Sequence, residues 1–152
     1  MTNRLRCDVL VVGARCAGAS TAMLLARAGL RVLLIDRGEY GTDTISTHAL
    51  MRAGVLQLRR WGLLPRIEQA GTPPIRSTGF HYGDDVVEIA IGESHGVQAL
   101  YAPRRTVLDR VLVDAAVEAG AEVRHRHSLA QLTHTPDGRI SGAIIQGATS
   151  EP

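Results

Sequence analysis

The stretch that decides the fold runs from Cys7 to Arg37 and reads CDVLVVGARCAGASTAMLLARAGLRVLLIDR. It opens with a short apolar run that ends at a glycine, which is typical of a β-strand buried on both faces. Residues 16–28 are small or favour helices, and Gly29 follows where a helix C-terminal glycine belongs. Residues 30–35 are predicted to form a second buried strand, which ends at Asp36. This order predicts a βαβ unit of the kind that binds dinucleotides.

Each part of the turn Gly13-Ala14-Arg15-Cys16-Ala17-Gly18 has a physical role. Gly13 permits the sharp turn out of the strand, and Gly18 lets the helix lie close to the sheet. The N–H groups and the positive dipole end of the helix suit a pyrophosphate. Asp36 lies about twenty residues on, where a carboxylate accepts hydrogen bonds from ribose hydroxyls and repels a 2′-phosphate. The unit therefore predicts an unphosphorylated adenosine ribose, as in FAD or NAD rather than NADP.

Arg15 departs from the usual glycine fingerprint, which has glycine at the third place of the turn. It must keep a negative φ, and its side chain either turns aside or lays its guanidinium on the phosphates. The alternative to nucleotide binding is a βαβ unit without a ligand. The strand before the turn, and the helix, second strand and acid after it, favour the nucleotide.

Length and composition fit one domain in a reducing compartment. The chain has 152 residues, and it lacks both a signal-peptide pattern and the apolar run of about eighteen residues that a membrane span needs. Cys7 and Cys16 suggest no disulfide framework, so we expect a cytoplasmic protein. We interpret Cys16 as a packing residue, with a reactive thiol as the alternative. The absence of lysine excludes Schiff-base chemistry, and the scarce aromatic residues argue against nucleic-acid binding.

The rest of the chain predicts a Rossmann-like α/β domain with a central parallel sheet, helices and inserted antiparallel strands. We divide it into residues 1–74 with the βαβ unit and further helices, 75–102 with the inserted strands, and 103–147 with a helix and returning strands. A plain NAD-dependent dehydrogenase would instead continue directly into more βα repeats. The expected elements are helices ending at Gly62 and Gly120, a short helix beginning near Leu63, and strands at 77–82, 86–91, 97–102, 122–126, 129–133 and 140–146.

Several segments together resemble a known family. These are the N-terminal unit with Asp36-Arg37, the segment MRAGVL at 51–56, the segment RRTVLD at 104–109, and Gly120-Ala121-Glu122. They look like the FAD-dependent monooxygenases of the para-hydroxybenzoate hydroxylase type, whose framework the geranylgeranyl reductase-like and halogenase-like flavoproteins share. The resemblance covers nearly the whole chain and implies an FAD-binding domain.

The resemblance also implies roles for individual residues. The amides of the turn from Gly13 to Gly18, with Arg15, would face the FAD pyrophosphate. Asp36 would bind the adenosine ribose, and Arg37 would lie beside the adenine. Arg52 would approach the flavin half, and Arg105 the ribityl–phosphate side; a surface salt bridge is the alternative for each arginine. Ser46, Thr47 and His48 either cap a helix or lie on the flavin side.

Two motifs of the resembled family are not in this chain: an Asp-Gly motif and a later Gly-Asp motif. Asp137-Gly138 is predicted to be a hairpin turn instead. We therefore expect the amino-terminal portion of a longer enzyme, as a truncated product, a fragment or half of a split protein. Its partner would be the missing C-terminal half. The isolated chain is expected to be marginally stable, because an edge and an apolar face are left uncovered.

Other constellations are weaker. His125 and His127 alternate along a predicted strand and so share a face, but no third ligand accompanies them. We expect solvent-facing histidines and no metal site. Asp43, Ser46 and His48 have the residue types of a hydrolytic triad, but closeness in sequence does not assemble one. No residue stands out as an acid or a base, so catalytic residues are unassigned.

The functional prediction is an FAD-dependent oxidoreductase, most simply a monooxygenase acting on a small organic substrate with NAD(P)H as electron donor. The flavin would supply the chemistry, and the protein would bind, orient and shield it. Two alternatives are a non-catalytic fragment that binds FAD or an adenine nucleotide, and an NAD-binding dehydrogenase domain.

Overall fold

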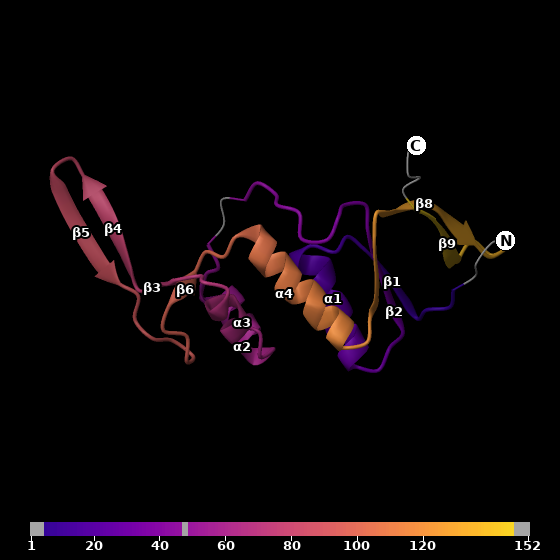
Figure 1. Ribbon diagram of the computed structural model, residues 1–152, viewed down its shortest axis with the longest axis horizontal. Helices are drawn as coiled ribbons and strands as arrows, with labels where there is room; N and C mark the ends of the chain where they lie inside the picture. Colours follow the sequence, from indigo (N-terminus) through magenta and orange to yellow (C-terminus); the bar gives the residue numbers. More distant parts are fainter. Residues whose placement is uncertain (1–4, 47–48, 148–152) are drawn as a thin grey trace. The chain divides into compact units, whose positions relative to one another are not determined.

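A computed structural model describes residues 5–46 and 49–147 (Figure 1). The described chain forms two compact units, residues 5–42 with 112–147 and residues 43–111. The predicted α/β fold with both parallel and antiparallel strands is confirmed. The elements are β1 (Val9–Val12), α1 (Cys16–Arg27), β2 (Val32–Asp36), α2 (Arg52–Arg60), α3 (Leu64–Gln69), β3 (Pro74–Ile75), β4 (Ser77–Tyr82), β5 (Asp85–Ala90), β6 (Leu100–Tyr101), α4 (Arg105–Glu118), β7 (Glu122–His125), β8 (His127–His134) and β9 (Ile140–Gly147).

The first unit is built on a parallel sheet in the order β1-β2-β7. Val9 pairs with Val32 at one end of the β1–β2 ladder, and Asp36 pairs with His125 at the end of the β2–β7 ladder. α1 connects β1 to β2 and packs on both strands (Figure 1). The sheet therefore has the βαβ connection that the sequence predicts, with Asp36 at the carboxyl edge of its central strand.

β1 is less buried than the sequence predicts. The apolar run suggested a strand covered on both faces, and this prediction is wrong, because Val12 is 55% exposed and the other three residues of β1 are half-buried. In the described part of the chain β1 is an edge strand, and only β2 has a neighbour on each side. Residues Val32–Ile35 of β2 are accordingly buried.

α1 begins and ends as its sequence indicates. Its buried side chains are small or flexible, namely Ala19, Ala22 and Met23, so the helix can lie close to the sheet. The helix ends at Arg27, and Gly29 follows in the left-handed region with a φ of 86°. The Gly29 N–H donates to the Ala26 carbonyl at 2.9 Å, which satisfies a helix-end acceptor.

β8 and β9 form an antiparallel hairpin in the first unit. Its turn contains Asp137-Gly138, as predicted, and Gly138 has a φ of 84°. The Thr135 N–H donates to the Arg139 carbonyl at 2.8 Å and closes the hairpin.

The second unit has a small core between helices and short strands. One cluster of its buried residues consists of Val55, Val97, Ala99 and Tyr101. Residues 97–102 were predicted to be one strand, but only Leu100–Tyr101 is a strand, which pairs with β3. Val97 instead forms an isolated bridge with Ser94, because both belong to a tight turn closed by two backbone hydrogen bonds.

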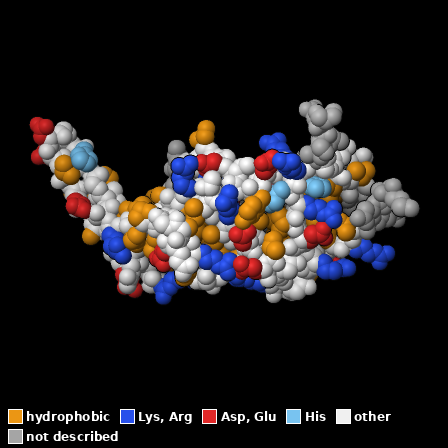
Figure 2. All heavy atoms as spheres, viewed as in Figure 1, with side chains coloured by type: hydrophobic (Ala, Val, Ile, Leu, Met, Phe, Trp, Pro, Cys, Tyr) orange, Lys and Arg blue, Asp and Glu red, His pale blue; other side chains and the backbone are white. Residues whose placement is uncertain are grey.

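The predicted hairpin of β4 and β5 is also confirmed. The strands pair in register from Ser77 opposite Ala90 to Tyr82 opposite Asp85. Several large apolar side chains of this hairpin are exposed, and Figure 2 shows hydrophobic and acidic side chains on its visible face, at the left. None of the described helices is both long enough and apolar enough to span a membrane.

Candidate nucleotide-binding site

The turn after β1 is shaped by two glycines. Gly13 has a φ of 104°, and its N–H donates to the Ile35 carbonyl of β2 at 2.7 Å. A Cβ on Gly18 would lie only 1.7 Å from the Gly13 carbonyl oxygen. A residue with a side chain at position 18 would therefore force α1 away from the turn.

The Asp36 carboxylate is hydrogen-bonded to this turn and to the loop that follows β2. Its Oδ2 accepts the Ala14 N–H at 2.6 Å, and its Oδ1 accepts the Gly38 N–H at 2.6 Å. A carboxylate has about four lone-pair sites, so both oxygens keep capacity for ribose hydroxyls. The structure thus brings together the turn and the acid that the sequence singled out.

The N-terminal end of α1 lies in the same turn. Arg15 is the N-cap residue, with an extended backbone (φ −91°, ψ −173°), and no side-chain hydrogen bond caps the helix there. Cys16 and Ala17 are its first two residues, and the first turn of the helix holds no acidic residue. Because the first N–H groups of a helix lack intrahelical acceptors, this end suits an anion such as a pyrophosphate.

The Arg15 side chain reaches the end of the loop that follows Asp36. Its Nη1 donates to the Thr42 carbonyl at 3.0 Å, and its Nη2 donates to Thr42 Oγ1 at 3.1 Å. The guanidinium also passes near Gly38, since a Cβ on that glycine would lie 3.7 Å from Arg15 Nη2. Thr42 was missed at the sequence level, because a threonine in a polar loop carries no distinctive pattern.

A second group of contacts ties the loop after β2 to the end of β7. Arg126 donates its N–H to the Gly38 carbonyl at 3.0 Å, and its guanidinium pairs with Glu39. The Tyr40 ring meets the His125 ring edge-on, with centroids 5.5 Å apart. Arg37, beside this loop, is exposed. These partners lie far apart in sequence, so no local motif signals them.

The prediction of two solvent-facing histidines is wrong for His125. Both of its ring nitrogens are buried and have no hydrogen-bond partner. Arg126 has a φ of 58° and interrupts the strand, so His125 and His127 do not alternate along one continuous strand. His127 Nδ1 instead lies 2.7 Å from the His125 carbonyl oxygen. Within residues 5–46 and 49–147, no three His, Cys, Asp or Glu residues gather to hold a metal.

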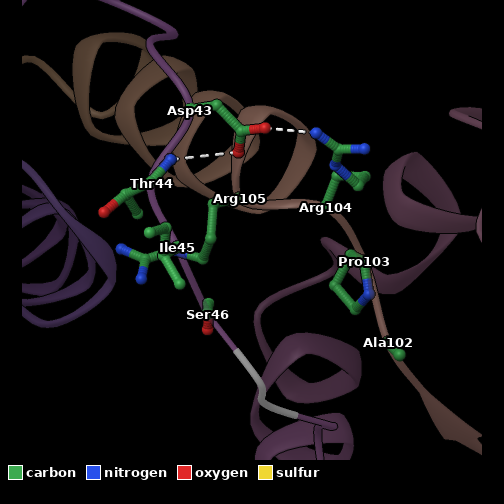
Figure 3. Close-up of a pocket in the computed structure, with 8 residues that line it drawn as sticks. All are labelled: Asp43, Thr44, Ile45, Ser46, Ala102, Pro103, Arg104 and Arg105. Atoms are coloured by element: carbon green, nitrogen blue, oxygen red, sulfur yellow. Dashed lines mark hydrogen bonds and ion pairs between the residues drawn. The ribbon is translucent and has the colours of Figure 1, made fainter.

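The second unit contains a cavity of about 670 Å³ (Figure 3). Asp43 lines it, accepts the Thr44 N–H at 3.0 Å and pairs with Arg104. The Arg104 guanidinium lowers the pKa of the Asp43 carboxyl below its usual value. The cavity is lined by Asp43, Thr44, Ile45, Ser46, Ala102, Pro103, Arg104 and Arg105.

Arg105 and Arg52 also lie in the second unit. Arg105 forms a two-point pair with Asp109, with Nη2–Oδ2 at 3.0 Å and Nε–Oδ1 at 3.1 Å. Both side chains are largely buried, at 18% and 5% exposed. Arg52 donates from Nη1 to the Gly92 carbonyl. Thr47 and His48 lie outside the described residues. The suggested hydrolytic triad includes His48, so it also lies outside them.

Comparison with known proteins identifies the family. Residues 6–151 match the FAD binding domain family. The chain is 31% identical over 144 residues to menaquinone reductase of Mycolicibacterium smegmatis, covering 92% of this chain and 34% of that protein.

Solved structures show the same fold. The myxobacterial chondrochloren halogenase CndH superposes with a TM-score of 0.77 at 24% identity, covering 93% of this chain and 33% of the halogenase. PqsL, a probable FAD-dependent monooxygenase from Pseudomonas aeruginosa, gives a TM-score of 0.78 at 17% identity, over 91% of this chain and 38% of PqsL. The chain thus spans about a third of menaquinone reductase and of the halogenase. By its sequence match and its fold, the chain belongs to the FAD binding domain family.

Proposed function

We propose that this chain binds FAD through its first unit and forms part of an FAD-dependent oxidoreductase. The observation that carries the proposal is the Asp36 carboxylate hydrogen-bonded to the Ala14 N–H, at the uncapped N-terminus of α1. An acid for the ribose and a helix end for the pyrophosphate are thereby next to each other. The lack of room for a side chain at Gly18 fits a cradle for the adenosine diphosphate half of FAD.

The residues have separate roles in this proposal. Asp36 binds the ribose hydroxyls, the turn from Gly13 to Gly18 holds the pyrophosphate through the amides at the start of α1, and Arg37 lies beside the adenine. In the second unit, Arg52 approaches the flavin half and Arg105 the ribityl–phosphate side. FAD supplies the redox chemistry when bound, while these residues bind and orient it.

The wider activity is proposed from the family. The named relatives include a reductase, a halogenase and a probable monooxygenase, and we propose a monooxygenase-type reaction on a small organic substrate with NAD(P)H as donor. The remaining part of the enzyme would be supplied by a C-terminal half, since the chain spans only 34% of menaquinone reductase. Cys7 and Cys16 form no disulfide, which supports a cytoplasmic location.

Binding measurements test the proposal. We expect FAD and ADP to bind the chain, and Asp36→Asn to weaken both about tenfold or more, because a charged acceptor for the ribose is lost. Calorimetric titration measures both affinities. Asp8→Asn is the matched control, since Asp8 is an exposed acid of the same unit that pairs with Arg31. Equal affinity in wild type and Asp36→Asn would refute the assigned role.

A second candidate is nucleotide binding without turnover, which the partial coverage of the relatives favours. NAD(P)H oxidation by the chain, measured with and without added FAD, separates the two. Oxidation that depends on FAD supports the enzyme. A chain that binds FAD without oxidising NAD(P)H supports the binding module. An NAD-binding dehydrogenase domain would bind NAD in preference to FAD.

A further inference from the structure

The loop from Gly38 to Thr42 is anchored at its start, middle and end. At its start, the Gly38 N–H donates to Asp36 Oδ1 at 2.6 Å. In the middle, the Tyr40 hydroxyl donates to Asp114 Oδ1 at 2.6 Å. At its end, Thr42 accepts both hydrogen bonds from Arg15. Of these three anchors, only the bonds from Arg15 come from a side chain of the turn between Gly13 and Gly18.

The Arg15 anchor acts close to the ribose-binding acid. A Cβ on Gly38 would lie 3.0 Å from Asp36 Oδ1 and 3.7 Å from Arg15 Nη2, so carboxylate, glycine and guanidinium are packed together. Thr42 Oγ1 in turn donates to the Glu39 carbonyl at 3.1 Å. This bond links the end of the loop to the residue that follows Gly38. Holding the loop therefore also holds the Gly38 N–H that orients Asp36.

We propose that Arg15 is a positioning residue. It holds the 38–42 loop in place through its hydrogen bonds to Thr42 and thereby keeps Asp36 aligned for the ribose of an adenine nucleotide. The inference rests on the proposed nucleotide-binding function. It explains how this turn uses an arginine where the fingerprint has glycine: the side chain acts on the loop beside the ribose. The alternative is a direct contact between the guanidinium and the pyrophosphate.

Adenosine and ADP distinguish these roles, because only ADP carries a pyrophosphate. If Arg15 acts through the loop, Arg15→Ala weakens adenosine and ADP by the same factor, about tenfold. Thr42→Val removes the hydroxyl acceptor and keeps the carbonyl acceptor, so it is expected to weaken the binding of both ligands by a smaller factor. In the double variant the losses do not add, since the two residues act as one unit. Arg15→Lys keeps the charge and restores part of the affinity for both ligands.

Calorimetric or NMR titration of the full chain measures these affinities, and amide hydrogen exchange reports on the loop. We expect faster exchange of the Gly38 amide in Arg15→Ala. Arg31→Ala is the matched control, because it removes an arginine of the same unit that pairs with Asp8 instead. It should change neither the affinities nor the exchange at Gly38.

The outcomes separate the inference from the function on which it rests. A loss of affinity confined to ADP overturns the positioning role and assigns Arg15 to the pyrophosphate. If the wild-type chain binds both ligands and Arg15→Ala binds them with unchanged affinity, only the positioning role is overturned. A wild-type chain that binds neither ligand overturns the proposed function together with the positioning role. Equal losses for both ligands with partial rescue by lysine support it.

Discussion

Gly18 is the residue on which the close approach of α1 to the turn depends. Its missing side chain leaves room for the Gly13 carbonyl, which would lie 1.7 Å from a Cβ. We predict that Gly18→Ala lowers the free energy of unfolding by about 1–3 kcal/mol, because backbone must shift to relieve the overlap. Denaturant unfolding followed by circular dichroism measures this change.

Gly92→Ala is the control for that substitution. A Cβ on Gly92 would meet nothing within 4 Å, and this glycine has no positive φ. Its replacement should leave the free energy of unfolding nearly unchanged. Equal stabilities for Gly18→Ala and wild type would show that α1 does not need a glycine at this turn.

Tyr101 gives the protein a pH dependence at the alkaline end. Burial, followed by the hydrogen bond to Glu68, raises the pKa of Tyr101 to about 12. The ordinary pKa is about 10, so the fold favours the neutral phenol. The stability that this preference contributes is fully present below pH about 10 and is lost as the pH rises toward 12.

We therefore predict that the highest-pH step in the ultraviolet titration of the tyrosines belongs to Tyr101. Tyr101→Phe should remove that step, and Glu68→Gln should move it to lower pH. Tyr82→Phe is the control, because Tyr82 is 67% exposed. Loss of the highest-pH step in Tyr82→Phe, with the step retained in Tyr101→Phe, would contradict the assignment.

At the scale of elements, the β4–β5 hairpin presents one apolar face. Phe80 lies opposite Val87, and Ile89 points to the same side as Val87 because side chains alternate along a strand. All three are between 44% and 53% exposed. A two-stranded hairpin has little stability of its own, and this face is therefore a surface for apolar probes.

We predict that Val87→Thr with Ile89→Thr lowers the fluorescence of a bound hydrophobic dye and reduces self-association in sedimentation. Fold stability should hardly change, since exposed side chains contribute little burial. The control is Val86→Thr, because Val86 is 58% exposed and lies on the opposite face of the hairpin. An equal effect of Val86→Thr would mean that the apolar face is not the dye site.

The sequence predicts elements well where the signal is local. The meeting of Ala14 with Asp36 follows from a compact motif, and the hairpin turn at Asp137-Gly138 follows from its turn residues. The exposed edge of β1 did not follow, because it depends on which strands pair. Contacts such as Arg15 with Thr42, 27 residues apart, depend on the folded loop and leave no pattern in the sequence.

At the scale of the whole molecule, exposed apolar surface lowers the stability that we expect for the isolated chain. Val12 on the edge strand and Ile45 are 55% and 99% exposed, in addition to the hairpin face. An open strand edge and uncovered apolar side chains both favour association over a stable monomer. These features fit a protein whose relatives have about three times its length, since the chain spans 34% of menaquinone reductase.

We therefore predict that the isolated chain is marginally stable and that a ligand stabilises it measurably. FAD or ADP at about 100 times its Kd should add about 2.7 kcal/mol to the free energy of unfolding, because it binds only the folded state. Thermal unfolding with and without ligand, with dye binding followed in parallel, measures both effects. Asp36→Asn serves as the control, since tenfold weaker binding should reduce the added stability at the same ligand concentration to about 1.4 kcal/mol. A sharp cooperative melt without dye binding in ligand-free buffer would contradict the marginal stability, and an undiminished ligand-induced shift in Asp36→Asn would place the ligand elsewhere.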